Sequence, residues 1–399
     1  MPDRNAHVVR PGDPDYRWAL SGYSRRGWKA PREIVFACQP EHVSATVIRC
    51  REHGIPLVIR NSRFGQAEAC FESGSIILDV SRINTITLAR SGETVSVGAG
   101  ATSLVAADVL STRSVRVPMG MHPEVSLVGI ALAGGVGMSC RSLGLVCDAV
   151  IEAEVVDTDG QLVRASFAEN PDLFWALRGA GCAGFGIVTC LTLRTWPASP
   201  VVLFDVDWQH SDADQVWAAW QDWAPSTDRG LSSALSFDKN LVRLSGQFHG
   251  TEHRLLSLIS PMLRTGAAVN VNTRRMSQRD AVRAFAEPEG PHPMLRWGAA
   301  VSGPATDFCA FPWRNSPYIM ETTAHWASPT SEQSARAWTA DARHLAAEWI
   351  DGLYAGWPDP DDPDWLKSAY GNNLSRLRRV HVRWDPYNVF RSRFGVGWD

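Results

Sequence analysis

Two glycine-rich stretches provide backbone that a negatively charged ligand could approach closely. Their members are Gly134, Gly135, Gly137, Gly179, Gly181 and Gly186. The pyrophosphate of a dinucleotide is dianionic and needs backbone N–H groups at hydrogen-bonding distance, where side chains would obstruct it. Glycine permits this approach because it lacks a Cβ and accepts positive φ. The alternative is that these glycines serve only turns and tight packing, and the glycines by themselves favour that alternative.

Side chains with acid–base or metal chemistry are scattered rather than clustered along the sequence. The eight cysteines include no Cys-x-x-Cys pair, and no histidine cluster lies beside them at zinc-ligand spacing. We therefore expect reduced, mostly buried cysteines and no metal site. His249 and His325 fall on expected strands and could face a cavity, although surface or hydrogen-bonded core histidines are commoner.

The first half of the chain alternates short strand-like and helical segments. The expected strands are 33–38, 56–60, 75–80 and 92–97, and the expected helices are 40–53 and 102–110. Residues 154–163 predict a hairpin, because Asp159-Gly160 is a favoured tight turn.

From about residue 200 the pattern becomes that of one antiparallel sheet with helices on one face. The expected strands are 201–208, 231–236 and 241–248, and the expected helices are 212–223 and 253–263. From Trp365 onwards we expect the chain to return to the first domain.

Composition excludes several classes of partner. The 399 residues carry a formal charge of -3, which gives no electrostatic case for nucleic acid or an anionic membrane. Without a run of about 18 apolar residues, no membrane-spanning helix is expected. The polar, Pro-containing start of the sequence predicts a cytoplasmic protein. The oligomeric state does not follow from the sequence.

Three ordered blocks of sequence carry a wider pattern. They comprise 31–35 with 58–60 and 77–81, then 118–148 with 172–181 and 185–189, and finally 370–377 with 384–390. Together they resemble the berberine bridge enzyme-like branch of the p-cresol methylhydroxylase-type FAD proteins, within the vanillyl-alcohol oxidase superfamily. Weaker similarities such as 311–314 extend the resemblance over nearly the whole chain. A single glycine-rich stretch is a weak signal, whereas ordered blocks at matching distances are a strong one.

The resemblance implies an α+β fold with two domains. The FAD-binding domain would span 1–198, an antiparallel-sheet substrate domain backed by helices 199–364, and a returning C-terminal segment 365–399. Residues implied at the FAD are Arg60, Ser62, Arg63, Phe64, Gly65, Asp79, Gly120, His122, Gly134, Gly135, Gly137, Asp148, Gly186, Ile187, Val188, Tyr370 and Asn373. Those implied in catalysis are Tyr370, Tyr354 and His122.

The usual covalent flavin anchors are replaced. Members of the family commonly attach the flavin through a histidine and often a cysteine, at the positions of Phe64 and His122 here. A phenyl ring offers no nucleophilic atom, so attachment at Phe64 is excluded. Ser62 and Arg63 stand where two glycines would cradle the pyrophosphate. Arg63 could turn towards the phosphates and supply charge, or it could fill the space so that FAD no longer binds.

Three hypotheses follow for the function. The first is oxidation of a small organic molecule in secondary metabolism by non-covalent FAD, with Tyr370 as base or positioning group and Asn373 orienting the ring system. The second is a redox-neutral cyclisation or isomerisation of a natural-product intermediate, with flavin lost or only structural. The third, ranked last, is a binding protein that sequesters its ligand.

Overall fold

The computed structural model describes most of the chain. The described residues are 6–22, 30–62, 74–237, 240–284, 294–299, 308–324, 326, 328–359, 361–390, 392 and 394–397, with only the backbone path for 294–299, 329 and 330. Arg63, Phe64, Gly65 and His325 lie outside these residues.

A four-stranded sheet forms the N-terminal end of the molecule, in the order β1-β2-β4-β3. Its strands are β1 (His7–Val9), β2 (Glu33–Phe36), β3 (Leu57–Arg60) and β4 (Ile76–Asp79), and its helices are α1 (Tyr16–Leu20) and α2 (Pro40–His53). Helix α2 begins with a proline, whose fixed φ suits a first turn, and ends at Gly54 in the left-handed region. Its buried Val43, Val47 and Cys50 pack with the sheet.

A five-stranded antiparallel sheet, ordered β5-β6-β10-β8-β9, follows. The strands are β5 (Ile86–Leu88), β6 (Thr94–Gly98), β8 (Val150–Val156), β9 (Leu162–Ser166) and β10 (Ile187–Arg194). The helices are α3 (Ser103–Ser111), α4 (Leu127–Leu132), α5 (Cys140–Leu143) and α6 (Pro171–Ala180), while β7 (Val115–Arg116) pairs with β11 (Trp196–Pro197). Residues of α3, α4 and α6 share one hydrophobic core with this sheet.

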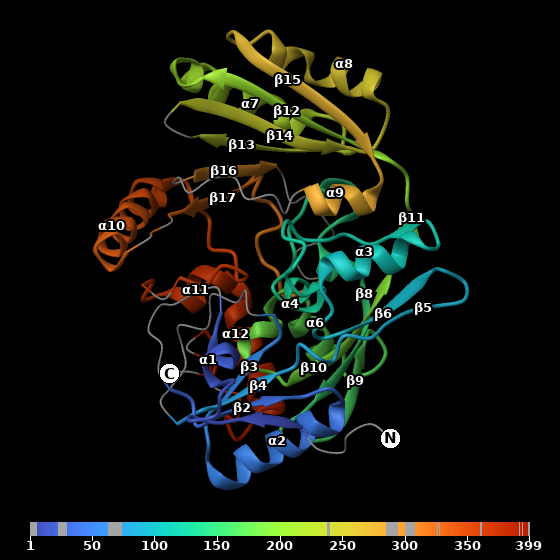
Figure 1. Ribbon diagram of the computed structural model, residues 1–399, viewed down its shortest axis with the longest axis vertical. Helices are drawn as coiled ribbons and strands as arrows, with labels where there is room; N and C mark the ends of the chain where they lie inside the picture. The colour runs from blue at the N-terminus through green and yellow to red at the C-terminus, as the bar shows by residue number, and fades with distance from the viewer. Residues whose placement is uncertain are drawn as a thin grey trace.

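A six-stranded sheet, ordered β15-β12-β14-β13-β16-β17, occupies the other end of the molecule (Figure 1). The strands are β12 (Val201–Gln209), β13 (Leu231–Phe237), β14 (Leu241–Phe248), β15 (Ala268–Met276), β16 (Met294–Ala299) and β17 (Tyr318–Thr323). The helices are α7 (Ala213–Ser226), α8 (Glu252–Leu263), α9 (Gln278–Ala284) and α10 (Pro329–Ala346). A second hydrophobic core joins α7 and α8 to the sheet.

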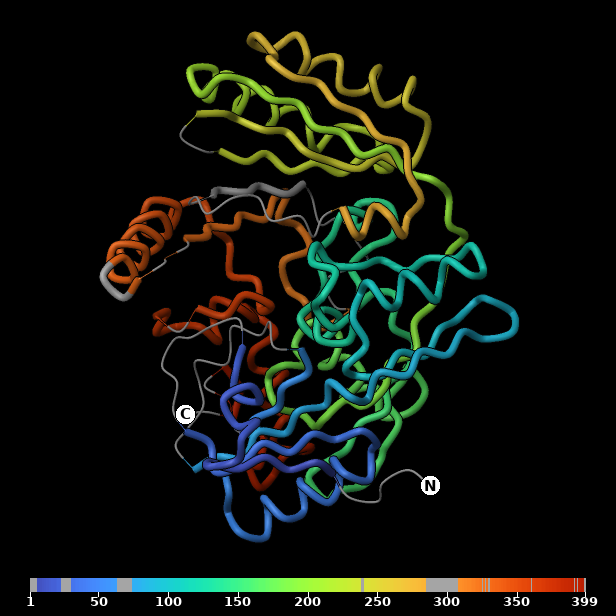
Figure 2. The backbone as a smooth tube through the Cα atoms, viewed as in Figure 1, coloured from blue at the N-terminus to red at the C-terminus, as the bar shows by residue number. Residues whose placement is uncertain are grey.

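The end of the chain returns to the first half of the molecule. Helices α11 (Trp365–Tyr370) and α12 (Leu374–Trp384) contribute Trp365, Tyr370 and Leu377 to the core of the five-stranded sheet. Figure 2 shows this red C-terminal tube among the blue and green segments. Ala310 joins the same core, so the segment 308–314 also crosses into the first half.

The structure confirms the α+β class and the predicted elements, whose ends differ by one or two residues in most cases and by up to four at single ends. The hairpin with its turn at Asp159-Gly160 forms between β8 and β9. The domain limits at 198 and 364 remain predictions. Among the described helices, none is long and apolar enough to cross a membrane.

Candidate functional site

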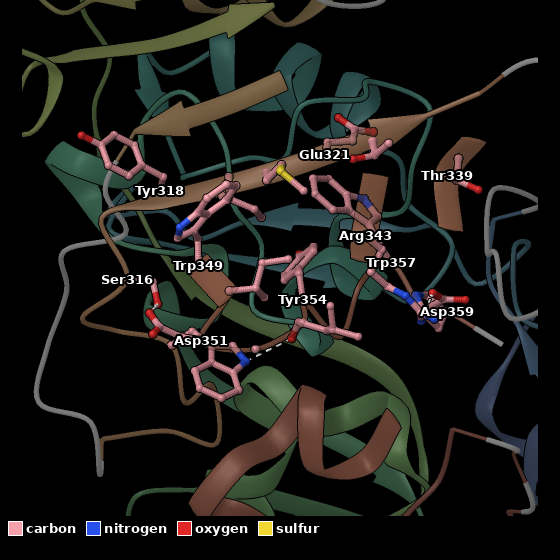
Figure 3. Close-up of a pocket in the computed structure, with 18 of the residues that line it drawn as sticks. Ser316, Tyr318, Glu321, Thr339, Arg343, Trp349, Asp351, Tyr354, Trp357 and Asp359 are labelled. Atoms are coloured by element: carbon pink, nitrogen blue, oxygen red, sulfur yellow. Dashed lines mark hydrogen bonds and ion pairs between the residues drawn. The ribbon is translucent and has the colours of Figure 1, made fainter. Parts of the chain in front are cut away.

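A cavity of about 430 Å³ lies between β17, α10 and the segment 349–361. Its walls are rich in aromatic side chains, namely Phe311, Trp313, Tyr318, Trp349, Tyr354 and Trp357. Figure 3 shows Tyr354 near the centre of this group and charged groups, including Glu321 and Asp359, at the edges. Arg343 of α10 forms an ion pair with Asp359 at 2.7 Å and so ties the helix to the opposite wall. The lining also includes six charged residues, namely Glu321, Arg336, Arg343, Asp351, Asp359 and Asp361. A cavity of this size with aromatic walls is typical of sites for small organic ligands.

Tyr354 connects this cavity to the first glycine-rich turn. Its hydroxyl accepts a hydrogen bond of 3.1 Å from the N–H group of Gly135, and the backbone of Val136 interacts with it as well. Burial raises the pKa of the Tyr354 phenol, so the hydroxyl stays protonated at neutral pH. Tyr354 therefore holds the turn in place and retains its proton.

The glycines of both stretches are needed by the packing of the chain itself. Gly134 and Gly179 have φ of 112° and 108°, and both lie against Phe311. A Cβ on Gly134 would lie 2.7 Å from the Phe311 ring, and one on Gly179 would lie 2.6 Å from the Phe311 backbone nitrogen. The tight-packing explanation therefore accounts for these two positions. A Cβ would also collide with neighbouring atoms at the other glycines of the prediction, which are Gly120, Gly135, Gly137, Gly181 and Gly186.

Cys182 lies close to the two predicted catalytic tyrosines. It interacts electrostatically with both Tyr354 and Tyr370. The Cys182 side chain is exposed, although desolvation raises the pKa of its thiol to about 11. Tyr370 is 2% exposed, and burial raises the pKa of its phenol.

These features fit a bound cofactor. The buried Nη1 atom of Arg60 has no partner among the described residues, and a buried donor without a partner is costly unless a ligand or water completes its hydrogen bonds. Tyr370, Cys182 and the turn at Gly134 to Val136 would border the group. Trp313 joins this region to the cavity, because its indole N–H lies 3.0 Å from the carbonyl oxygen of Leu353 and 3.1 Å from that of Ala369.

Other predicted FAD residues lie on the N-terminal sheet. Arg60 ends β3 and donates to Asp79 at 2.7 Å and to the carbonyl of Ala19 at 2.9 Å. Its Nη1 atom is buried and has no described partner. Ser62 is half-buried, and the side chain of the preceding Asn61 lies against Gly129. The Arg60–Asp79 pair holds the end of β3 against β4.

The carboxylate of Asp148 is hydrogen-bonded by other residues of the protein. Arg314 donates to both its carboxylate oxygens, at 2.6 and 2.7 Å, and the N–H group of Leu145 donates at 2.8 Å. Cys147 and Cys309 complete this cluster. Apart from the weak similarity at 311–314, no sequence pattern indicates this cluster, because its two halves lie far apart along the chain.

The remaining predicted residues lie in three different settings. His122 is exposed, and its Nδ1 accepts from the N–H group of Glu124 at 3.3 Å. Asn373 donates to the carbonyl of Ala310 at 3.1 Å, so it holds the crossing segment 308–314. Ile187 and Val188 are buried in β10.

His249 lies at the contact between β14, β7 and α5 and is absent from the lining of the cavity. Its Nδ1 accepts from Arg116 at 2.6 Å, and its Nε2 lies 3.3 Å from the hydroxyl of Ser139. Burial and the nearby Arg116 lower the pKa of His249 to about 4. The imidazole is therefore neutral and structural rather than a base near pH 7.

Comparisons with known proteins identify the fold and the family. Residues 31–166 match the FAD binding domain family, and 353–397 match the family described as berberine and berberine like. The FAD-linked oxidoreductase YgaK of Bacillus subtilis is 29% identical over 96% of this chain and 95% of its own length. The xylooligosaccharide oxidase of Thermothelomyces thermophilus is 28% identical over 96% of this chain and 90% of its own length.

The structure of Physcomitrella patens BBE-like 1 superposes with a TM-score of 0.89 at 23% identity, covering 97% of this chain and 96% of that one. It confirms the fold that the resemblance implied. Two separate regions of the chain match domains of one enzyme class. The chain therefore carries the domains of berberine bridge enzyme-like FAD-linked oxidoreductases, enzymes whose cofactor is FAD.

Proposed function

We propose that this protein binds FAD without a covalent link and oxidises a small organic molecule, an intermediate of secondary metabolism, in the aromatic cavity. The observation that carries this proposal is the continuity of the site. The cavity wall reaches the glycine turn through the Tyr354–Gly135 hydrogen bond, and it reaches Tyr370 through Trp313. A substrate in the cavity would thus lie close to the glycine turn and to Ala369, the residue before Tyr370.

The chain's own residues would bind and orient the substrate. When bound, FAD supplies a hydride acceptor, which is chemistry that side chains lack. Burial raises the pKa of Tyr370, so its hydroxyl is protonated at neutral pH and acts as a hydrogen-bond donor. We therefore assign Tyr370 the positioning role rather than that of a base. Trp313 and Tyr354 offer flat faces against which a ring can stack.

The absence of a covalent link is tested by the absorbance of the purified protein before and after acid precipitation. Oxidised flavin absorbs near about 370 and 450 nm. We expect these bands to move into the supernatant, because Phe64 has no nucleophilic atom, His122 replaces the cysteine thiol, and its Nδ1 already accepts a hydrogen bond from Glu124. A bond from His122 to the flavin is the alternative that this experiment also tests. Colour that remains with the pellet would show a covalent link and refute this part of the proposal.

The positioning role of Tyr370 is tested by anaerobic flavin reduction. Candidate substrates, from xylo-oligosaccharides to aromatic alcohols, are screened for loss of the band near about 450 nm. With a compound that reduces the flavin, Tyr370→Phe should slow reduction roughly 10- to 100-fold while FAD stays bound. The matched control is Tyr387→Phe, because Tyr387 is 61% exposed. Equal rates for Tyr370→Phe and wild type would remove Tyr370 from the reaction.

A second candidate is a redox-neutral cyclase or isomerase acting on a natural-product intermediate. It is favoured because two backbone N–H groups that could have bound a phosphate are hydrogen-bonded to side chains of the protein itself. The N–H of Gly135 is bonded to Tyr354, and that of Gly129 is bonded to the hydroxyl of Ser126 at 3.1 Å. A polyene intermediate incubated with protein stripped of FAD distinguishes the two functions. Cyclisation that is unchanged by added FAD would favour this candidate, and turnover that needs FAD would exclude it.

A further inference from the structure

Two buried cysteines meet where the crossing segment 308–314 reaches the first half of the molecule. Cys147 precedes β8 and Cys309 lies on the crossing segment, and both side chains are fully buried. Their sulfur atoms and a carboxylate oxygen of Asp148 lie within 4.8 Å of one another. The cavity-lining Phe311 and Tyr354 pack in the same hydrophobic cluster. The two thiols therefore belong to the same cluster as side chains that line the cavity.

A guanidinium group occupies the centre of the cluster. The Nη2 atom of Arg314 donates to the sulfur of Cys309 at 2.7 Å and lies 3.8 Å from that of Cys147. The same guanidinium group also donates hydrogen bonds to both carboxylate oxygens of Asp148. Arg314 thus already supplies the positive charge that a metal ion would bring. The arrangement points to thiol chemistry rather than to a metal site.

The two thiols differ in their ionisation. A hydrogen bond from Cys147 and the charge of Arg314 lower the pKa of Cys309 to about 6, against the opposing effect of burial. Burial and the neighbouring Cys309 raise the pKa of Cys147. At neutral pH the cluster therefore holds one thiolate beside one thiol. A thiolate is the nucleophile in reactions of cysteine with oxidants and disulfides.

We propose that Cys147 and Cys309 form a redox-active dithiol site whose oxidising substrate is hydrogen peroxide. The Cys309 thiolate attacks one peroxide oxygen, the O–O bond breaks, and the products are a sulfenic acid and hydroxide. The Cys147 sulfur then attacks the Cys309 sulfur and displaces hydroxide, which takes the Cys147 proton and leaves as water. The two thiols lose two electrons in total, and peroxide gains them. The resulting disulfide links the segment that carries Phe311 and Trp313 to the residues just before β8. The proposal is independent of the substrate of the flavin.

The disulfide between Cys147 and Cys309 can be identified from tryptic peptides. Cleavage by trypsin at Arg141 and Arg164 releases one peptide with Cys147, and cleavage at Arg296 and Arg314 releases another with Cys309. Each of these peptides holds a single cysteine. The native protein is treated with hydrogen peroxide, quenched, denatured in the presence of an alkylating reagent, digested and analysed by mass spectrometry without reduction.

We expect one cross-linked pair of these peptides, the loss of about two alkylatable thiols, and full recovery after dithiothreitol. Cys147→Ser and Cys309→Ser should each abolish the pair. Cys50→Ser is the matched control and should leave it intact, because Cys50 is buried in a different core and burial raises the pKa of its thiol to about 11.

Arg314→Lys provides a test that keeps both cysteines and a positive charge. A lysine cannot contact two sulfurs and a carboxylate through one planar group, so oxidation should slow about tenfold or more. In wild type the rate should reach half its maximum near the Cys309 pKa of about 6, and in the variant at a higher pH. Two results would overturn the proposal. The first is that peroxide oxidises the exposed Cys38 while the thiols of Cys147 and Cys309 both remain alkylatable. The second is that Cys309 is oxidised to a sulfinic or sulfonic acid and no cross-link to Cys147 forms.

Discussion

Replacing Arg314 by methionine should destabilise the protein far more than losing an ordinary surface ion pair. The side chains of Arg314 and Asp148 are 2% and 7% exposed, so the pair is shielded from water. Arg314→Met keeps much of the side-chain volume but leaves the Asp148 carboxylate buried without its cation. Removing one partner of such a pair costs about 3–5 kcal/mol, because the remaining charge is uncompensated.

The measurement is urea unfolding at pH 7 followed by tryptophan fluorescence. Arg336→Met is the control, because Arg336 pairs with Glu332 on the exposed surface of α10 and should cost about 0.5 kcal/mol. Adding Asp148→Asn to Arg314→Met should recover part of the loss, since the orphaned charge disappears. Equal midpoints for Arg314→Met and Arg336→Met would refute the buried-pair reasoning, as would a double variant less stable than the single one.

Three further predictions concern other parts of the structure. The folded-state pKa of His249, about 4, lies below the unfolded value of about 6.5, so stability is complete above pH 6.5 and is lost as pH falls towards 4. That loss of unfolding free energy, about 3 kcal/mol by pH 4, should be absent from the urea midpoints of His249→Gln. Gly179→Ala should cost about 3 kcal/mol or more because its Cβ meets the Phe311 backbone, whereas Gly54→Ala, with open space around it, should cost only about 1 kcal/mol by the same assay. Tyr354→Phe should lower stability by about 1–3 kcal/mol, since a backbone N–H loses its partner, and an unchanged unfolding midpoint would contradict that hydrogen bond.

Local signals made the secondary structure predictable. Helix α2 runs from Pro40 to His53 as expected, because a proline suits the first turn and Gly54 takes the left-handed conformation that ends the helix. The β8–β9 hairpin forms at Asp159-Gly160 for an equally local reason. Such signals depend on neighbours a few residues away, so the sequence displays them directly.

The candidate site was predictable only in part. The chain brings Tyr354 to the glycine turn and buries Tyr370 in the core of the five-stranded sheet. The catalytic roles of both tyrosines remain predictions. The sequence left open whether His249 faces a cavity, and the structure shows it in contact with Arg116 and Ser139. The strand that ends just before it, at Phe248, was predicted correctly, but the partners of His249 depend on how the halves of the molecule meet.

The sequence by itself determined the order of the elements, the family and the loss of a nucleophile at Phe64, because all three are properties of residue types and their spacing. Only the tertiary structure decided that Gly134 and Gly179 accommodate Phe311, and that Cys147 meets Cys309 around Arg314. These contacts join segments that are distant along the chain. Their partners are selected by the packing of whole layers against one another, and no local pattern of residues encodes that packing.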